Sequence, residues 1–128
     1  MAERIRVLMA EDNPDHVELC REFLPSNEFF LDAAKNGKEA LQKARTSKYD
    51  IIVLDYRLPD VTGAQLLKDI RAFEKDTPII FVTAMDDPDI SFQVLKNGAS
   101  DYVPKTFQYY EMLKERILEN LHAHKEKA

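Results

Sequence analysis

The sequence predicts one α/β domain in which five parallel strands form a doubly wound sheet with helices on both faces. Short apolar runs alternate with segments of about 10 to 15 residues that have helical spacing of apolar residues. Two runs, Ile51–Leu54 and Ile79–Val82, are apolar at every position, which is typical of central strands covered on both faces. A length of 128 residues fits a single domain, residues 1–128.

The expected strands are the apolar runs themselves. In chain order they are Ile5–Ala10, Phe29–Ala33, Ile51–Leu54, Ile79–Val82 and Tyr102–Val103. Glu28 and Asp32 flank or interrupt the second run, so we expect it at an edge of the sheet. Crossovers between parallel strands are right-handed, which distributes the helices over both faces.

Capping signals mark where the helices between these strands begin and end. Asn13-Pro14 and Asp87-Pro88 each place a capping side chain before a proline at the first helical position. Asn36–Glu39 and Thr62–Gln65 resemble capping boxes, and Asn97-Gly98 predicts a left-handed helix stop. The last helix is expected to bury one stripe and then to give way to a charged tail from about residue 122; the stripe is Tyr110, Leu113, Ile117 and Leu121.

The composition of the chain excludes several classes of function. The 18 basic and 23 acidic residues give a net charge of −5, so the chain lacks the positive field that nucleic-acid or anionic-membrane binding needs. No apolar run approaches the roughly 20 residues of a membrane span. A single cysteine, Cys20, excludes an internal disulfide, and the N-terminus has no apolar signal core, so we expect a cytoplasmic protein.

Polar side chains follow the predicted strands where each strand ends. Ligands of open parallel sheets bind outside these carboxyl ends. If the first and third strands are neighbours, three carboxylates, a hydroxyl and an ammonium meet there: Glu11, Asp12, Asp55, Thr83 and Lys105. The convergence is a prediction about the fold, because these residues are far apart in the chain.

This set of groups fits phosphoryl transfer. Crowded carboxylates repel one another, and Mg²⁺ removes that cost because it binds carboxylate, water and phosphate oxygens. Lys105 and Thr83 are suited to the other phosphoryl oxygens, one as a point charge and one as a hydroxyl donor. A carboxylate can attack phosphorus, and Asp55 is the best candidate because it ends a central strand.

The chain resembles the receiver domains of two-component response regulators along essentially its whole length. The resemblance rests on the acid pair Glu11-Asp12, the segment from Asp55-Tyr56-Arg57-Leu58-Pro59 to Gly63, Thr83-Ala84, and Tyr102 with Lys105 three positions later. It implies the flavodoxin-like strand order 2-1-3-4-5. It also implies a phosphorylation-controlled switch that catalyses its own phosphorylation and dephosphorylation but is not a turnover enzyme.

The resemblance assigns a role to each site residue. Asp55 would accept a phosphoryl group from a histidine kinase or phosphotransfer protein, and Lys105 would pair with that group. Asp12, Asp55 and the backbone carbonyl of Arg57 would bind Mg²⁺, with Glu11 acting mainly through a metal-bound water.

The resemblance also implies how the signal leaves the site. Thr83 would move to hydrogen-bond the phosphoryl group, and Tyr102 would turn inward as an aromatic switch. That movement would alter the surface of the fourth helix, fifth strand and fifth helix, where a downstream protein partner would bind.

The sequence departs from the family pattern after the lysine. The family usually has proline there, whereas Thr106 follows Lys105 and Pro104 precedes it. Leu58 replaces the family's usual methionine, a nearly volume-conserving change. Arg57 and Met85 stand at positions that tune the lifetime of the phosphorylated state in the family, and we hypothesise that long non-acidic side chains there restrict the attacking water.

Two other functions remain open at this stage. A receiver-like module without phosphotransfer would bind its partners constitutively, whereas a flavin-binding electron carrier would need a neutral or positive phosphate loop in place of Glu11–Asp15. Tyr102 is alternatively a packed aromatic, and Cys20 is expected in the core. His16 is expected on an exposed helical face, and the sequence makes no partner for it evident.

Overall fold

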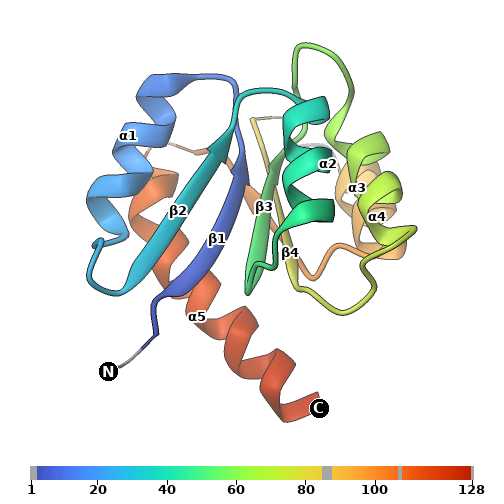
Figure 1. Cartoon of the computed structure of the whole chain (residues 1–128). Coiled ribbons are helices and arrows are strands. Elements are labelled where there is room, and N and C mark those ends of the chain that lie inside the picture. Colours follow the sequence, from blue (N-terminus) through green and yellow to red (C-terminus); the bar gives the residue numbers. More distant parts are fainter. Residues whose placement is uncertain (1–2, 85–87, 107, 128) are drawn as a thin grey trace.

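The computed structural model describes residues 3–84, 88–106 and 108–127, which form alternating strands and helices around one parallel sheet (Figure 1). The elements are β1 Ile5–Ala10, α1 Pro14–Phe23, β2 Phe29–Ala34, α2 Gly37–Thr46, β3 Ile51–Asp55, α3 Gly63–Arg71, β4 Ile79–Thr83, α4 Pro88–Lys96, β5 Asp101–Pro104 and α5 Tyr109–Lys127. The strand order is β2-β1-β3-β4-β5 and every pairing is parallel, as predicted.

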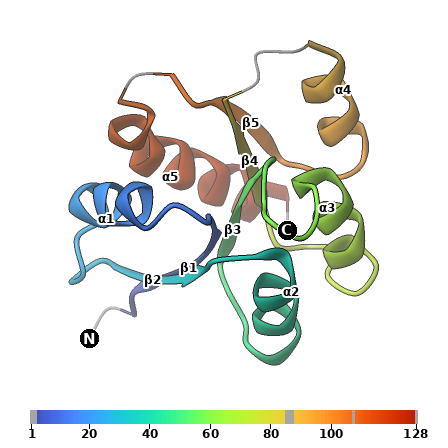
Figure 2. The same ribbon diagram turned by 90° about the horizontal axis from the view of Figure 1, so that it is seen from above.

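The sheet separates two apolar cores. α1 and α5 cover one face, and α2, α3 and α4 cover the other (Figure 2). β3 and β4 are buried at every position because their side chains point alternately into the two cores. β3 and β4 each extend one residue beyond their apolar runs, so Asp55 and Thr83 are their last residues.

The predicted capping signals are confirmed where the structure describes them. The side chain of Asn13 accepts the backbone N–H of Asp15 at 2.9 Å, and Asn36 accepts that of Glu39 at 2.8 Å. The side chain of Thr62 likewise caps the start of α3 by accepting the backbone N–H of Gln65. Gly98 has a φ of 113°, and the N–H of the following residue closes onto the end of α4, as in a Schellman motif. Asp87 lies outside the described residues.

The last helix differs from its prediction at both ends. Tyr109, which the sequence interpretation passed over, is buried with Leu113 and Ile117, whereas Tyr110 and Leu121 are only partly buried. The expected tail from about residue 122 is helical instead, since α5 continues through Lys127 (Figure 1). Alanine, lysine and glutamate in this segment favour helix without needing a buried stripe.

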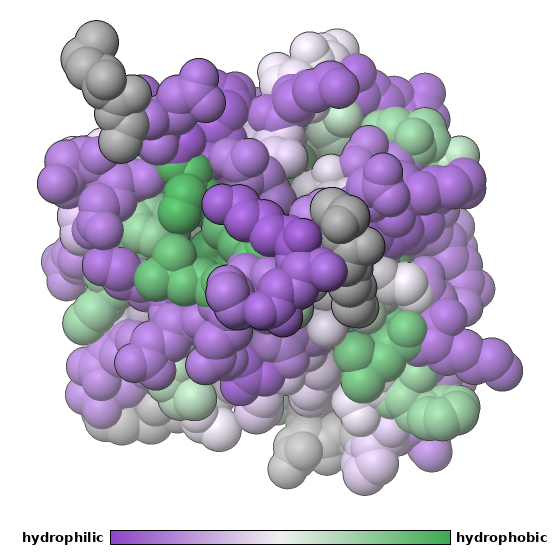
Figure 3. All heavy atoms as spheres, turned by 90° about the horizontal axis from the view of Figure 1, so that it is seen from below, coloured by the Kyte–Doolittle hydropathy of each residue, from purple (hydrophilic) through white to green (hydrophobic). Residues whose placement is uncertain are grey.

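The amino ends of the strands present a mostly hydrophilic surface with separate apolar patches (Figure 3). Among the described residues, no helix has the length and apolarity needed to cross a membrane.

Candidate functional site

The carboxyl ends of β1 and β3 bring three acidic side chains together. Ala10 pairs with Leu54, so Glu11 and Asp12 follow β1 beside Asp55 at the end of β3. One carboxylate oxygen from each of the three acids lies within 4.8 Å of the others. Glu11 and Asp55 are buried, whereas Asp12 is exposed at the mouth of the pocket. The predicted convergence of the acids is therefore confirmed.

Lys105 reaches this acidic pocket from the end of β5. Its backbone N–H donates to the carbonyl of Thr83 at 2.7 Å, which continues the pairing of β4 with β5 by one residue. The ammonium Nζ then lies 3.0 Å from Oδ2 of Asp55 and forms an ion pair with Glu11. Its side chain is only 10% exposed, so water screens these charges weakly.

Burial and neighbouring charges shift the pKa of two enclosed groups in the pocket, Glu11 and Lys105. Burial raises the pKa of Glu11, and the nearby charge of Asp55 adds to that rise, although Lys105 opposes it. Burial would lower the pKa of Lys105, but the hydrogen bonds and charges of Glu11 and Asp55 outweigh it and raise that pKa. The pocket thus keeps its ammonium charged, while one of its acids is costly to ionise without further positive charge.

The substitution of Thr106 for the family's proline does not keep Lys105 from the pocket. The described residues contain no cis peptide bond, and the N–H of Thr106 donates to the carbonyl of Pro104 at 2.8 Å in a tight turn. This turn leaves the Lys105 side chain directed at the carboxylates.

Asp55 is held in place by the loop that follows it. The N–H of Tyr56 donates to the carbonyl of Val82 at 3.1 Å, and the N–H of Gly63 donates to the carbonyl of Tyr56 at 2.6 Å. A Cβ on Gly63 would stand 2.2 Å from the backbone oxygen of Asp55, so only glycine permits this close return of the chain. The N–H of Arg57 lies 3.4 Å from Oδ1 of Asp55.

The two predicted switch residues lie on the strands beside Asp55. Thr83 is buried at the end of β4, one position beyond the residue that pairs with Asp55. Tyr102 is half-buried in β5 and packs against the core beneath α2, α3 and α4. The roles of Thr83 and Tyr102 in switching remain predictions. Met85, the other expected lifetime residue, lies outside the described residues.

The structure gives His16 partners that were not evident from the sequence. Its Nδ1 lies 3.2 Å from Nζ of Lys105 and 3.4 Å from Oε1 of Glu11, and its ring meets that of Tyr109 edge to face at 6.2 Å. Tyr109 also lies under the Lys105 ammonium, 5.5 Å from Nζ to the ring centroid. The available signal was the position of His16 in the first turn of a helix that follows the acid pair.

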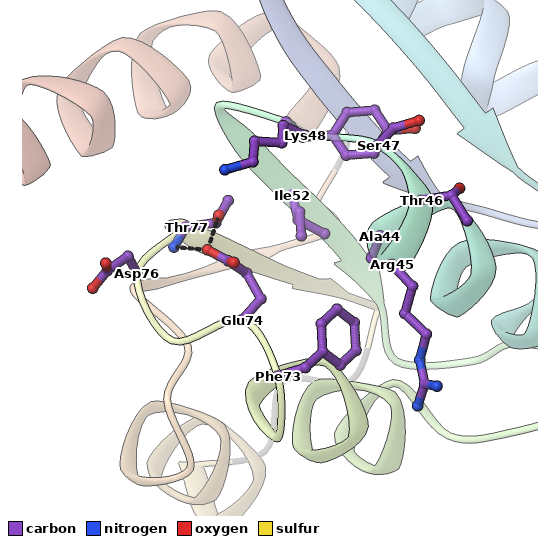
Figure 4. Close-up of a pocket in the computed structure, with 11 residues that line it drawn as sticks. Ala44, Arg45, Thr46, Ser47, Lys48, Ile52, Phe73, Glu74, Asp76 and Thr77 are labelled. Atoms are coloured by element: carbon purple, nitrogen blue, oxygen red, sulfur yellow. Dashed lines mark hydrogen bonds between the residues drawn. The ribbon is translucent and has the colours of Figure 1, made fainter.

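A larger hollow lies elsewhere, at the amino ends of β3 and β4 (Figure 4). Phe73, Arg45 and Ile52 line it together with Glu74, which accepts hydrogen bonds from Thr77. It mixes both signs of charge and contains none of the predicted site residues. The acidic pocket is instead a small, strongly charged site at the opposite edge of the sheet.

Comparison with known proteins decides the family. A family model described as the response regulator receiver domain matches residues 7–117. The chain belongs to the response regulator receiver domain family. It is a receiver domain of a two-component regulator, not a conventional enzyme, and its acidic pocket is consistent with a phosphoacceptor site.

Curated relatives are longer than this receiver domain. Regulatory protein VanRB of Enterococcus faecalis is 36% identical over 110 residues, which are 86% of this chain and 50% of VanRB. Transcriptional regulatory protein HprR of Escherichia coli is 35% identical over 109 residues, 85% of this chain and 48% of HprR. The chain thus spans about half the length of these two regulators.

Solved structures show the same fold. Response regulator TrrA of Thermotoga maritima, in complex with Mg²⁺-BeF, is 33% identical with a TM-score of 0.80, covering 91% of this chain and 98% of TrrA. A CheY-like receiver domain from Methanospirillum hungatei has a TM-score of 0.89, covering 98% of this chain and 100% of its own. At 23% identity, this likeness shows only that the fold is shared. The acidic triad of this chain is typical of a Mg²⁺ site.

Proposed function

We propose that Asp55 is the phosphoacceptor, and that it takes its phosphoryl group from a phosphohistidine of a kinase or phosphotransfer protein. The observation that supports this most strongly is the buried Asp55 carboxylate with Lys105 Nζ at 3.0 Å and two more acids around it. An Asp55 oxygen attacks phosphorus, the P–N bond breaks, and its electron pair returns to the donor's imidazole. Lys105 neutralises charge on the transferred group.

The donor atoms around Asp55 suit Mg²⁺. Asp12 and Asp55 would hold the ion directly with the backbone carbonyl of Arg57, and Glu11 would act through water, since hard oxygen donors are what this cation prefers. When bound, the ion would offset the mutual repulsion of the acids and the negative charge of the phosphoryl group. The exposure of Asp12 leaves one side of the pocket open to a phosphoryl donor.

Output would pass through the fourth and fifth strands. Thr83 would hydrogen-bond the phosphoryl group on Asp55, and Tyr102 would turn inward in response. Both changes lie next to the surface of α4, β5 and α5, where a downstream protein partner would bind. This signalling would take place in the cytoplasm and would involve neither a membrane nor nucleic acid bound by this domain.

Incubation with Mg²⁺ and a small acyl phosphate, followed by intact-mass measurement, tests the proposal. The wild type should gain the mass of one phosphoryl group, whereas Asp55→Asn should gain none, because its amide oxygen is a poor nucleophile. Chelating Mg²⁺ should abolish the gain in the wild type. No gain in either protein, with both folded, would favour a receiver-like module that binds partners constitutively.

A further inference from the structure

The Lys105 ammonium has an acceptor for each of its three N–H donors. Among the described residues these acceptors are Oε1 of Glu11, Oδ2 of Asp55 and Nδ1 of His16. The two carboxylates are already engaged in the proposed chemistry, since both belong to the acidic triad. His16 is the remaining contact, and it offers a ring nitrogen instead of a negative charge.

The contact also defines the protonation pattern of the His16 ring. An ammonium has no lone pair and can only donate, so a hydrogen bond over the 3.2 Å between Nζ and Nδ1 requires the tautomer of the neutral ring that carries its proton on Nε2. A proton on Nδ1 would instead face Oε1 of Glu11 at 3.4 Å.

His16 and Tyr109 together define where the ammonium can lie. The Tyr109 ring centroid is 5.5 Å from Nζ, and the two aromatic rings meet edge to face at 6.2 Å. Tyr109 is buried at the start of α5, whereas the His16 side chain is 36% exposed on α1. The ammonium thus rests against a fixed ring, with the imidazole on its solvent side.

We propose that His16 is a positioning residue for phosphorylation, which accepts one Lys105 proton and keeps the ammonium available to a phosphoryl group on Asp55. This rests on the proposed role of Asp55. Lys105 must exchange carboxylate contacts for phosphoryl oxygens, and a neutral acceptor retains Nζ without competing for the transferred group. Without His16, Nζ would settle more tightly onto Glu11 and meet the phosphoryl group less readily.

A matched pair of variants isolates the acceptor. His16→Asn keeps an acceptor oxygen near the position of Nδ1. The leucine of His16→Leu has nearly the same shape as that asparagine but offers no hydrogen-bond acceptor. We expect His16→Leu to weaken beryllofluoride binding in Mg²⁺ and to slow acyl-phosphate labelling by about three- to tenfold, the range of one hydrogen bond. His16→Asn should restore both to within about twofold of wild type.

The controls separate this inference from the proposed function. A wild type that takes up no phosphoryl group would contradict the role of Asp55 itself. A labelled wild type with an equally active His16→Leu, or with His16→Asn as impaired as His16→Leu, would overturn the role of His16. Nitrogen-15 NMR of the wild type in alkaline buffer gives an independent readout: we expect the His16 proton on Nε2, and a proton on Nδ1 would contradict the contact.

Discussion

The guanidinium of Arg116 in α5 holds the carboxylate of Asp101 at the first residue of β5 through two hydrogen bonds. Nε lies 2.9 Å from Oδ2, and Nη2 lies 2.6 Å from Oδ1. Asn120, one turn further along α5, donates to the same carboxylate at 2.9 Å. Burial would raise the pKa of Asp101, but these hydrogen bonds outweigh it and lower that pKa.

Replacing Arg116 with methionine should therefore destabilise the domain in a pH-dependent way. We expect Arg116→Met to lower the free energy of unfolding by about 1 kcal/mol near neutral pH. Because folding lowers the pKa of Asp101, its ionised carboxylate stabilises the folded domain at pH values above 3.8, the ordinary pKa of this side chain. That stabilisation is lost as the pH falls through the pKa that Asp101 has in the folded state. Urea unfolding should show a smaller difference between variant and wild type at about pH 3 than at about pH 6, with the loss occurring below about pH 4.

Lys96→Met, at an exposed position on α4, is the control for loss of a positive charge. It should change stability by less than about 0.5 kcal/mol at either pH. A cost for Arg116→Met that stays constant with pH would contradict the role of the Asp101 carboxylate.

The fold was predictable because its signals are local. The apolar runs that precede Asp55 and Thr83 identified central strands, and the parallel fold then placed their carboxyl ends together. His16 was missed because its approach to Lys105 depends on the angle at which α1 leaves β1, which its position in the first turn of α1 does not fix. The end of α5 was missed because its charged residues were interpreted as solvated tail, although His122 pairs with Glu126 one turn away at 3.0 Å.

A side chain on Gly63 should disturb the phosphoacceptor loop. The Cβ of Gly63→Ala would stand 2.2 Å from the Asp55 backbone oxygen, which cannot move without shifting β3. We expect a loss of about 2 kcal/mol in unfolding free energy, together with slower acyl-phosphate labelling. Chemical denaturation and timed intact-mass spectra measure the two effects.

Gly37 provides the matched control. It likewise begins a helix, but the Cβ of Gly37→Ala would stand 2.2 Å from Cγ1 of Val61 and 3.2 Å from Oδ1 of Asp60, which are side-chain atoms and not backbone. This variant should cost less than half as much stability and should label at nearly the wild-type rate. Equal effects of the two substitutions would show that the backbone contact at Asp55 is unimportant.

Cationic side chains occupy the outer edge of β2. The carbonyl of Ala34 points toward β1, since it accepts the N–H of Glu11. Carbonyls alternate in direction along a strand, so those of Leu31 and Ala33 point away from β1, toward the outer edge. Arg21 Nη1 donates to the first at 2.9 Å and Lys43 Nζ to the second at 3.1 Å. These contacts hinder pairing with the edge strand of a second molecule.

Removing both cations should promote self-association. We expect the Arg21→Ala, Lys43→Ala double variant to form dimers or larger species at concentrations where wild type is monodisperse, measured by sedimentation velocity. Lys68→Ala with Lys96→Ala removes the same charge from exposed helical positions and should leave the sedimentation profile unchanged. Association in both double variants would attribute the effect to net charge instead of to the strand edge.

Cys20 should be chemically inert in the folded domain. It is fully buried on α1, its Sγ lies 3.9 Å from the Tyr109 hydroxyl, and burial raises the pKa of its thiol to about 11. The reactive thiolate is therefore scarce at neutral pH. Iodoacetamide should modify the protein rapidly in urea but not detectably in buffer, and fast modification of the folded protein would contradict this packing.

Borohydride trapping of the phosphorylated domain tests the central claim most directly. Reduction converts an aspartyl phosphate to homoserine, and peptide mapping by tandem mass spectrometry then locates the modified residue. With Mg²⁺ and an acyl phosphate, we expect homoserine at position 55 and none when Mg²⁺ is chelated. Homoserine at position 12 or at any other acid, with Asp55 intact, would contradict the assignment of Asp55 as the phosphoacceptor.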